Sequence, residues 1–338
     1  MKMKYGINDK VPIAKAIPLA LQHVFTIFTG TMAGSIMLAT GAGLDVNDTA
    51  LIIQCGMLIS CVASLIQSLG VFGLPIGSKL PIITAGSYTL ITPLVVFAAD
   101  PEIGLSGAFG AAFAGSIALF LLGPLVIKYL HKYFTPVITG SVVLSVGMCL
   151  LTTAYGKMVN YAPDDPDVKK YFVIAIVIAV LTLVLDSFAK GFIQSLSVLI
   201  AMSGVASRYV TALGSVIFGL LAFFPKFSQI LALLPSPVLG GVLLVMFGTI
   251  TSSGIRVIGM GNLTKRNMTI VAMAIAVGIG GNFAVEAGYL SFLPSTITTL
   301  CTGISGTALT ALILNFVLPK TEEDRKWEAE YAASLVEK

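Results

Sequence analysis

The chain has 338 residues, of which 56% are hydrophobic and 11% are charged, and its mean hydropathy is +0.96. Soluble globular domains carry about 25% charged residues, so this composition excludes an ordinary soluble domain. The formal net charge of +4 comes mostly from basic residues between apolar runs, and no basic patch indicates a nucleic-acid partner. The sequence therefore predicts a polytopic protein whose surroundings are the lipid bilayer.

Charges in the first half of the chain alternate in sign between the apolar runs. The tail 1–15 carries four lysines and one aspartate, so the positive-inside rule predicts a cytoplasmic N-terminus. Acidic residues follow the odd-numbered runs, and basic residues follow the even-numbered ones. The predicted spans of this half are 16–44, 49–72, a segment that ends near Asp100, 103–127, 134–155 and 171–185.

The alternation fails after Lys190. The run 191–207 is short and has a basic residue at each end, Lys190 and Arg208, so one crossing cannot leave both ends in the cytoplasm. Either membrane-spanning sequence is missing near residue 201, or this run enters and leaves on one side. Further spans are predicted at 209–225, 230–255, 268–285 and 289–318, before a cytoplasmic tail with a surface helix over 322–337.

The third apolar segment, 77–93, is the most irregular one. Pro81 and Pro93 lack backbone donors and Gly86 adds flexibility, which predicts a broken helix with free amide groups around Ser87 and Tyr88. In lipid, irregular backbone survives only where it is buried in protein or lines a polar cavity. The segment is therefore a predicted site for a polar planar solute, and the alternative is a kinked helix that uses small residues for close packing.

Ionisable residues inside spans are rare here. Gln22 and His23 lie within the first span, and His23 is a candidate for binding and proton coupling; the alternative is a histidine at the membrane interface. Every Asp and Glu lies in a tail, a loop or at a span edge, and Glu286 is interpreted as a loop residue.

The sequence offers no enzyme chemistry. It lacks the zinc-protease, phosphate-loop and serine-triad motifs, and its two histidines cannot supply a metal or triad site. Four cysteines lie in apolar runs without paired spacing and are interpreted as small buried hydrophobic residues: Cys55, Cys61, Cys149 and Cys301. The N-terminal run 16–44 is too long for a cleavable signal peptide.

A run of prolines and glycines in the second half resembles a known family signature. Leu-Pro-Ser-Pro-Val-Leu-Gly-Gly at 234–241, followed by Met246-Phe247-Gly248 and Gly254, is similar to the signature of the xanthine/uracil permeases, or nucleobase-ascorbate transporters. The Gln22-His23 pair resembles the Gln-His pair of that family's first span. Residues 81–93 resemble its third span, in which a short strand interrupts the helix.

The resemblance implies an all-α polytopic membrane protein of the cell membrane, with an inverted-repeat transporter fold of fourteen spans in a core and a gate domain. Here the third span is discontinuous and the second repeat is incomplete. The implied function is nucleobase uptake, of xanthine or another purine and alternatively uracil, by symport with H+ or Na+ and no other cofactor. A homodimer is one candidate assembly.

The implied domains follow the family order. They are a cytoplasmic tail at 1–15, core spans 1–4 at 16–132, gate spans 5–7 at 133–200, a core remnant at 201–228, gate spans 12–14 at 229–318, and a cytoplasmic tail at 319–338.

The resemblance also implies the substrate site and what it lacks. Gln22, His23, Gly86, Ser87 and Tyr88 match the family's binding positions, with Tyr88 at an aromatic position that is usually Phe. The two glutamates that the family supplies from spans eight and ten have no counterpart in this chain. We therefore expect a transport-deficient permease, and the alternative is a membrane assembly partner or binding remnant that does not transport.

Overall fold

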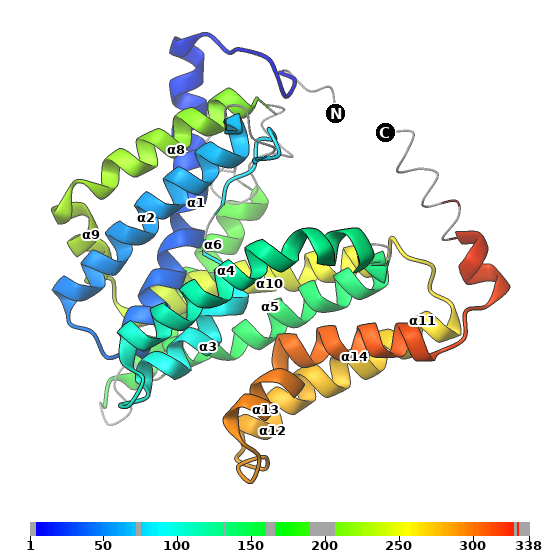
Figure 1. The fold of residues 1–338 in the computed structure, drawn as a ribbon. Coiled ribbons are helices and arrows are strands. Elements are labelled where there is room, and N and C mark those ends of the chain that lie inside the picture. Colours follow the sequence, from blue (N-terminus) through cyan, green and yellow to red (C-terminus); the bar gives the residue numbers. More distant parts are fainter. Residues whose placement is uncertain are drawn as a thin grey trace. The chain divides into compact units, whose positions relative to one another are not determined.

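The computed structural model describes residues 5–71, 76–84, 86–130, 133–159, 166–188, 207–327 and 330. Within these ranges it leaves out several side chains, among them those of Gln22, His23 and Tyr88. The described elements are helices, as the sequence predicts (Figure 1). They form two compact units, residues 1–112 with 165–241, and residues 113–164 with 242–338.

Six of the described helices lie wholly within the first unit. They are α1 (Ile13–Gly41), α2 (Val46–Leu69), α3 (Tyr88–Ala99), α6 (Val168–Phe188), α8 (Arg208–Ala222) and α9 (Pro225–Ala232). Two helices begin in this unit and continue in the second, α4 (Gly104–Leu130) and α10 (Ser236–Ile258).

Helix α2 is the centre of the first unit and packs against α1, α8 and α9 (Figure 1). Phe218 of α8 is fully buried with Ile53 and Met57 of α2. A Cβ on Gly219 would lie 2.6 Å from Cys61 Sγ, so this glycine lets α8 approach α2 closely. Close approach through small residues is the usual basis of helix packing in lipid.

The second unit is built around α5 (Pro136–Val159). The other helices that lie wholly within it are α11 (Lys265–Ile275), the π-helix η3 (Ala276–Gly280), α12 (Gly281–Glu286), α13 (Ser295–Cys301) and α14 (Gly303–Val317). A Cβ on Gly147 of α5 would lie 2.5 Å from the backbone nitrogen of Thr251 in α10. Ser145 of α5 also shares a hydroxyl hydrogen bond with Thr307 of α14.

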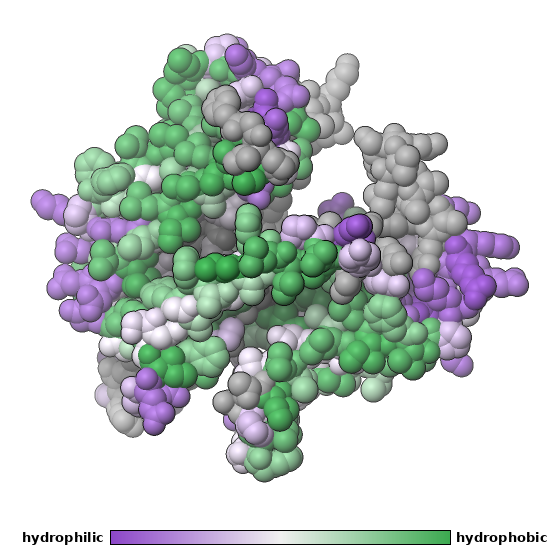
Figure 2. Space-filling model, viewed as in Figure 1, coloured by the Kyte–Doolittle hydropathy of each residue, from purple (hydrophilic) through white to green (hydrophobic). Residues whose placement is uncertain are grey.

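The helices confirm a multi-pass membrane protein. Five helices in the described part of the chain are long and apolar enough to cross a membrane, or six if α8 and α9, bent by 85°, count as one. Hydrophobic side chains cover much of the visible helix surface in Figure 2, and hydrophilic residues gather near the ends of α11 and α14. Such a distribution is expected where helix walls face lipid and helix ends face water.

Two of the predicted spans are wrong in detail. The run 289–318 is not one helix but a turn followed by two helices, α13 and α14. Gly288 before the turn and Gly303 at the start of α14 adopt positive φ, which interrupts a continuous helix. The span predicted from residue 230 begins later, since α9 extends to Ala232 and α10 starts at Ser236.

The predicted surface helix of the tail is also only partly correct. Its described helical residues are 322–327 and 330. Asp324 within it is buried, with 2% of its surface exposed, because its carboxylate accepts hydrogen bonds from Thr264 and Thr321. The beginning of the tail is thus attached to the beginning of α11.

Candidate functional site

The irregular third segment lies against α2, which satisfies its backbone polar groups. Ser60 Oγ donates to the carbonyl oxygen of Thr84 at 2.6 Å, and the Thr84 N–H donates to Ser64 Oγ at 2.8 Å. Both serines are buried, with 4% and 1% of their surface exposed. Unpaired backbone groups are costly in lipid, so these hydroxyls are what allows residue 84 to remain non-helical.

A second attachment holds the beginning of the same segment. Gln67 Oε1 accepts from both the N–H and the hydroxyl of Ser78 at 3.1 Å. Gly77 adopts φ +92°, and a Cβ there would collide with the carbonyl oxygen of Ile66. The non-helical chain from 76 to 84 is therefore fixed along α2 from Gln67 back to Ser60.

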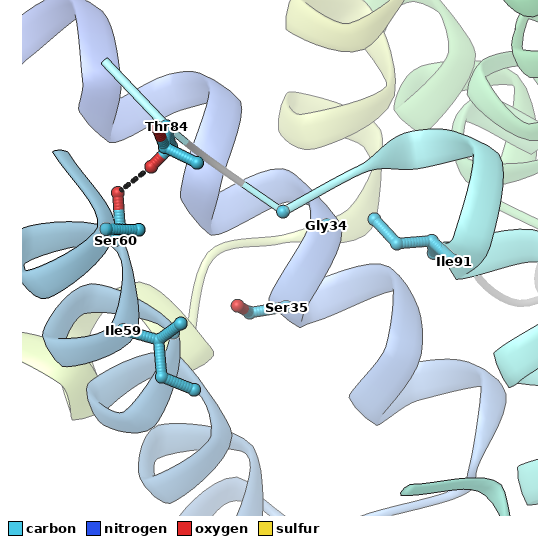
Figure 3. Close-up of a pocket in the computed structure, with 9 residues that line it drawn as sticks. Gly34, Ser35, Ile59, Ser60, Thr84 and Ile91 are labelled. Atoms are coloured by element: carbon cyan, nitrogen blue, oxygen red, sulfur yellow. Dashed lines mark hydrogen bonds between the residues drawn. The ribbon is translucent and has the colours of Figure 1, made fainter. Parts of the chain in front are cut away.

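A cavity of about 200 Å³ lies beside this segment in the first unit. Its walls come from α1, α2, the irregular segment and α3. In Figure 3, Ser35 of α1 and Ile91 of α3 point toward the space, while the Ser60–Thr84 hydrogen bond closes one side. The lining residues are Gly34, Ser35, Gly56, Ile59, Ser60, Ala63, Thr84, Gly86 and Ile91.

The cavity lies next to the first turn of α3. Ser87 is the N-cap residue, and its carbonyl oxygen accepts from the N–H groups of Leu90 and Ile91 at 3.0 and 3.3 Å. The amides of Tyr88 and Thr89 precede the first of these bonds, and amides at such positions have no partner within their own helix. Gly86 lines the cavity and has open space where a Cβ would be. Apolar walls with a few polar groups at one edge suit a small planar solute.

The predicted site residues are only partly brought together. Gly86 and Ser87 lie at or beside the cavity, whereas the side chains of Gln22, His23 and Tyr88 lie outside the described atoms. The backbone of α1 places His23 roughly 16 Å along the helix axis from the cavity residue Gly34, at 1.5 Å per residue. Their roles as binding residues stay predictions.

The prediction of a break over 77–93 is right in its first part and wrong at its end. Residues 76–84 and 86–87 are non-helical, but Pro93 lies inside α3. Its ring disturbs only the carbonyl four residues earlier, which leaves the remaining turns of α3 intact.

Sequence reasoning missed the serines that hold the segment. Ser60, Ser64 and Ser68 recur every four residues along α2 and are all buried. Hydroxyls at helical spacing on one face of an apolar span indicate a polar neighbour, so this spacing was a usable signal.

Glu286 is the last residue of α12 in the second unit and lies at a span edge, so its interpretation as a loop residue is wrong. Its carboxylate is exposed and accepts from Asn282 at 2.9 Å and from Thr152 of α5 at 3.4 Å. It therefore serves here as a hydrogen-bond acceptor between α12 and α5.

Comparison with known proteins identifies relatives along nearly the whole chain. A Clostridium perfringens protein named as a purine permease is 25% identical over 97% of this chain and 95% of its own length. The uric acid transporter UacT of Escherichia coli is 23% identical over 89% of the chain and 85% of its length. The xanthine permease XanP of Escherichia coli is 22% identical over 94% and 95%.

The comparisons also locate an internal gap. The alignment with XanP runs over 445 positions, although this chain has 338 residues. The sequence model of the xanthine/uracil family, described as a permease family, matches this chain in two pieces, residues 14–205 and 199–287. The two pieces meet where the charge pattern predicts missing sequence. Because the two matches together cover well over half of its residues, this chain belongs to the xanthine/uracil permease family, whose members are membrane transporters and not enzymes.

Proposed function

We propose that this chain is a nucleobase permease of the purine type that resides in the cell membrane. The observation that carries the proposal is the cavity beside the broken third segment, where apolar walls meet Gly86 and the first turn of α3. The names of the relatives, which include xanthine permeases and a uric acid transporter, support a purine rather than uracil as the substrate.

The proposed binding mode uses backbone more than side chains. A base is flat and has donors and acceptors on its edge, so it can lie against Ile59 and Ile91 and direct that edge toward the first amides of α3. Gly86 allows close approach because it has no side chain. Ser87 adds a hydroxyl, and the Tyr88 amide is the proposed principal donor.

Gln22 and His23 are proposed to complete the site from α1. The amide of Gln22 can both donate to and accept from a base edge. The imidazole of His23 changes charge near neutral pH, which makes it the proposed group for proton coupling, with Na+ as the other candidate ion. This role requires the substrate or a proton path to extend along α1 from Gly34 toward residue 23.

Transport is proposed to be impaired in this chain. The family's second-half glutamates are absent at the gap near residue 201, so only one half of the paired site remains. The second candidate function is therefore a membrane protein that binds base without transporting it, and it is favoured because every residue that lines the cavity precedes the gap.

The test is uptake of radiolabelled xanthine and uracil into cells that express the chain, beside a version with a relative's missing segment restored at Ala201. We expect uptake only with the restored chain, xanthine preferred over uracil, and loss of uptake in its His23→Ala variant. Uptake by the short chain itself would contradict transport deficiency.

Thermal unfolding of the purified short chain separates the two candidate functions. Stabilisation by xanthine without uptake supports a binding remnant. Absence of both stabilisation and uptake, with uptake regained on restoration, shows that the half-site alone does not bind.

A further inference from the structure

The N-terminal segment is attached to the beginning of α8, directly after the gap. The N–H of Arg208 donates to the carbonyl oxygen of Ile7 at 3.1 Å, and Ser207 Oγ donates to the carbonyl oxygen of Asp9 at 2.7 Å. Ser207 has 1% of its surface exposed. Figure 1 shows the start of the chain beside the start of α8. Residues 7–10 are thus held in a defined position.

This attachment brings two cations to one aromatic ring. Lys10 Nζ lies 5.9 Å and Arg208 Cζ lies 5.0 Å from the centre of the Tyr209 ring. One Arg208 NH2 group donates to the Tyr209 hydroxyl at 3.1 Å. Each cation can interact favourably with the ring, but the ring does not neutralise their charges.

Neither cation forms an ion pair in the described part of the chain. The ion pair found there is Lys170–Asp167, which involves neither of them. The neighbouring carboxylate of Asp9 accepts from the N–H of Gly6 at 2.7 Å. Arg208 Nε is buried and has no hydrogen-bond partner among the described residues, and the first turn of α8 contains no acidic residue. Asp9 supplies one negative charge beside these two cations, so an anion that accepts from the Arg208 NH2 and Lys10 ammonium groups would balance the remaining positive charge.

The chemistry favours a phosphate group. An arginine offers several donors in a planar fork and a lysine offers three more, which together match the acceptor oxygens of phosphate. The cations also sit at a membrane boundary, because α1 begins three residues after Lys10. Ile13 and Ile17 at the start of α1 are 75% and 43% exposed, so an apolar surface continues from the cations into the span.

We propose that Lys10, Arg208 and Tyr209 form a binding site for the headgroup phosphate of an anionic phospholipid, whose acyl chain lies along Ile13 and Ile17. The phosphate accepts from Arg208 and Lys10, and the Tyr209 hydroxyl donates to it. Free phosphate shares the headgroup chemistry but cannot use the apolar surface. The lipid therefore binds across the join between the N-terminal segment and α8.

The test measures thermal unfolding of the purified full chain in detergent while lipid is added. Phosphatidylglycerol, phosphatidylcholine and inorganic phosphate are compared, because the first combines net negative charge with acyl chains. We expect phosphatidylglycerol to raise the melting temperature, and the other two to leave it unchanged. The variants are Lys10→Gln, Arg208→Gln and their combination, with Lys226→Gln on α9 as an exposed lysine of the same unit.

We expect each site variant to need about fivefold more phosphatidylglycerol for the same shift, in line with the loss of one cation near a lipid surface. Lys226→Gln should behave like the parent chain. An equal response of the double variant and the parent would overturn the proposal. A full shift with inorganic phosphate alone would overturn the lipid assignment and leave a free-phosphate site. Should Arg208→Gln not fold, Lys10→Gln in the tail still decides the outcome.

Discussion

Single hydroxyl groups on α2 determine whether the third segment can remain irregular. Ser64 both accepts from the Thr84 N–H at 2.8 Å and donates to the Thr84 carbonyl oxygen at 3.3 Å. Ser60 donates to the same carbonyl. The carbonyl has two donors, whereas the N–H depends on Ser64, so the two serines are not equivalent.

Ser64→Ala should therefore destabilise the protein by about 0.5–1.5 kcal/mol, since it removes the hydrogen-bond partner of the partly buried Thr84 N–H. Thermal unfolding in detergent measures the change. The matched control is Ser116→Ala on α4, where the hydroxyl is exposed and bonds only its own helix at the Phe113 carbonyl. Equal melting temperatures for the two variants would show that the segment does not need Ser64.

A second residue-scale feature is the buried carboxylate of Asp324. Burial by itself raises the pKa of this group, but hydrogen bonds from Thr321 and Thr264 and the nearby charge of Arg266 outweigh it and leave the pKa below its ordinary value of 3.8. A lowered pKa means that the ionised form is stabilised by folding. This stabilisation is present at neutral pH and is lost as the pH falls below about 4 through the folded-state pKa.

Asp324→Asn should accordingly lower the melting temperature at pH 7, and the difference in melting temperature between variant and parent should narrow as the pH falls below about 4. Melting temperatures measured across this range check the prediction. Glu323→Gln is the control, because Glu323 is the exposed neighbour of Asp324. A gap that stays constant down to pH 3 would mean that the Asp324 charge contributes nothing.

At the scale of elements, the π-helix η3 depends on one of its glycines. A Cβ on Gly278 would collide with Thr307 Oγ1 and lie 2.6 Å from the Gly303 carbonyl oxygen of α14. Gly280, in the same π-helix, has open space at that position. Of these two glycines, Gly278 is therefore the one that allows η3 to pack closely against α14.

Gly278→Ala should destabilise the chain by about 1–3 kcal/mol through overpacking against α14. Gly280→Ala should be neutral or stabilising by about 0.5–1 kcal/mol, because alanine loses less conformational freedom than glycine in a helix. The melting temperatures of the two variants, each compared with that of the parent chain, test this difference. A destabilised Gly280→Ala variant would show that η3 needs both glycines for its backbone rather than for packing.

Elements could be predicted from the sequence where local chemistry decides them. Long apolar runs bounded by charges correctly predict α2, α4 and α5, because lipid leaves helices as the only solution for such runs. The interruption near Gly303 was missed, since a glycine inside an apolar run looks the same whether it packs helices or adopts positive φ.

The site was predictable to the same limited degree. Prolines and Gly86 mark the break directly, whereas Ser60 and Ser64 act through a contact between residues 20 and 24 positions apart. Pairing over such a distance depends on how the segment folds back onto α2. The burial of Asp324 was hidden for the same reason, because Thr264 lies 60 residues away.

At the scale of the whole molecule, the gap near residue 201 divides the chain into two topological halves. The domain boundaries inferred from the resemblance stay predictions, as does the cytoplasmic position of both tails. The basic residues Arg256, Lys265 and Arg266 lie around the connection between α10 and α11, which the positive-inside rule assigns to the cytoplasm. If an odd number of spans were lost with no compensation, this connection would be forced outside against its charges.

We expect the connection between α10 and α11 to lie in the cytoplasm, as its charges predict. The bend of 85° between α8 and α9 would then let residues 207–232 make up for the odd number of lost crossings. Truncated chains fused after Asn262 to a fluorescent protein or to alkaline phosphatase measure this in Escherichia coli. The fluorescent fusion should be bright and the phosphatase inactive, and a fusion after Asp45 should give the opposite pattern as the outside control. Phosphatase activity at residue 262 would mean that the second half is inverted, and hence that the helices after α9 face the side opposite to the one that their charges predict.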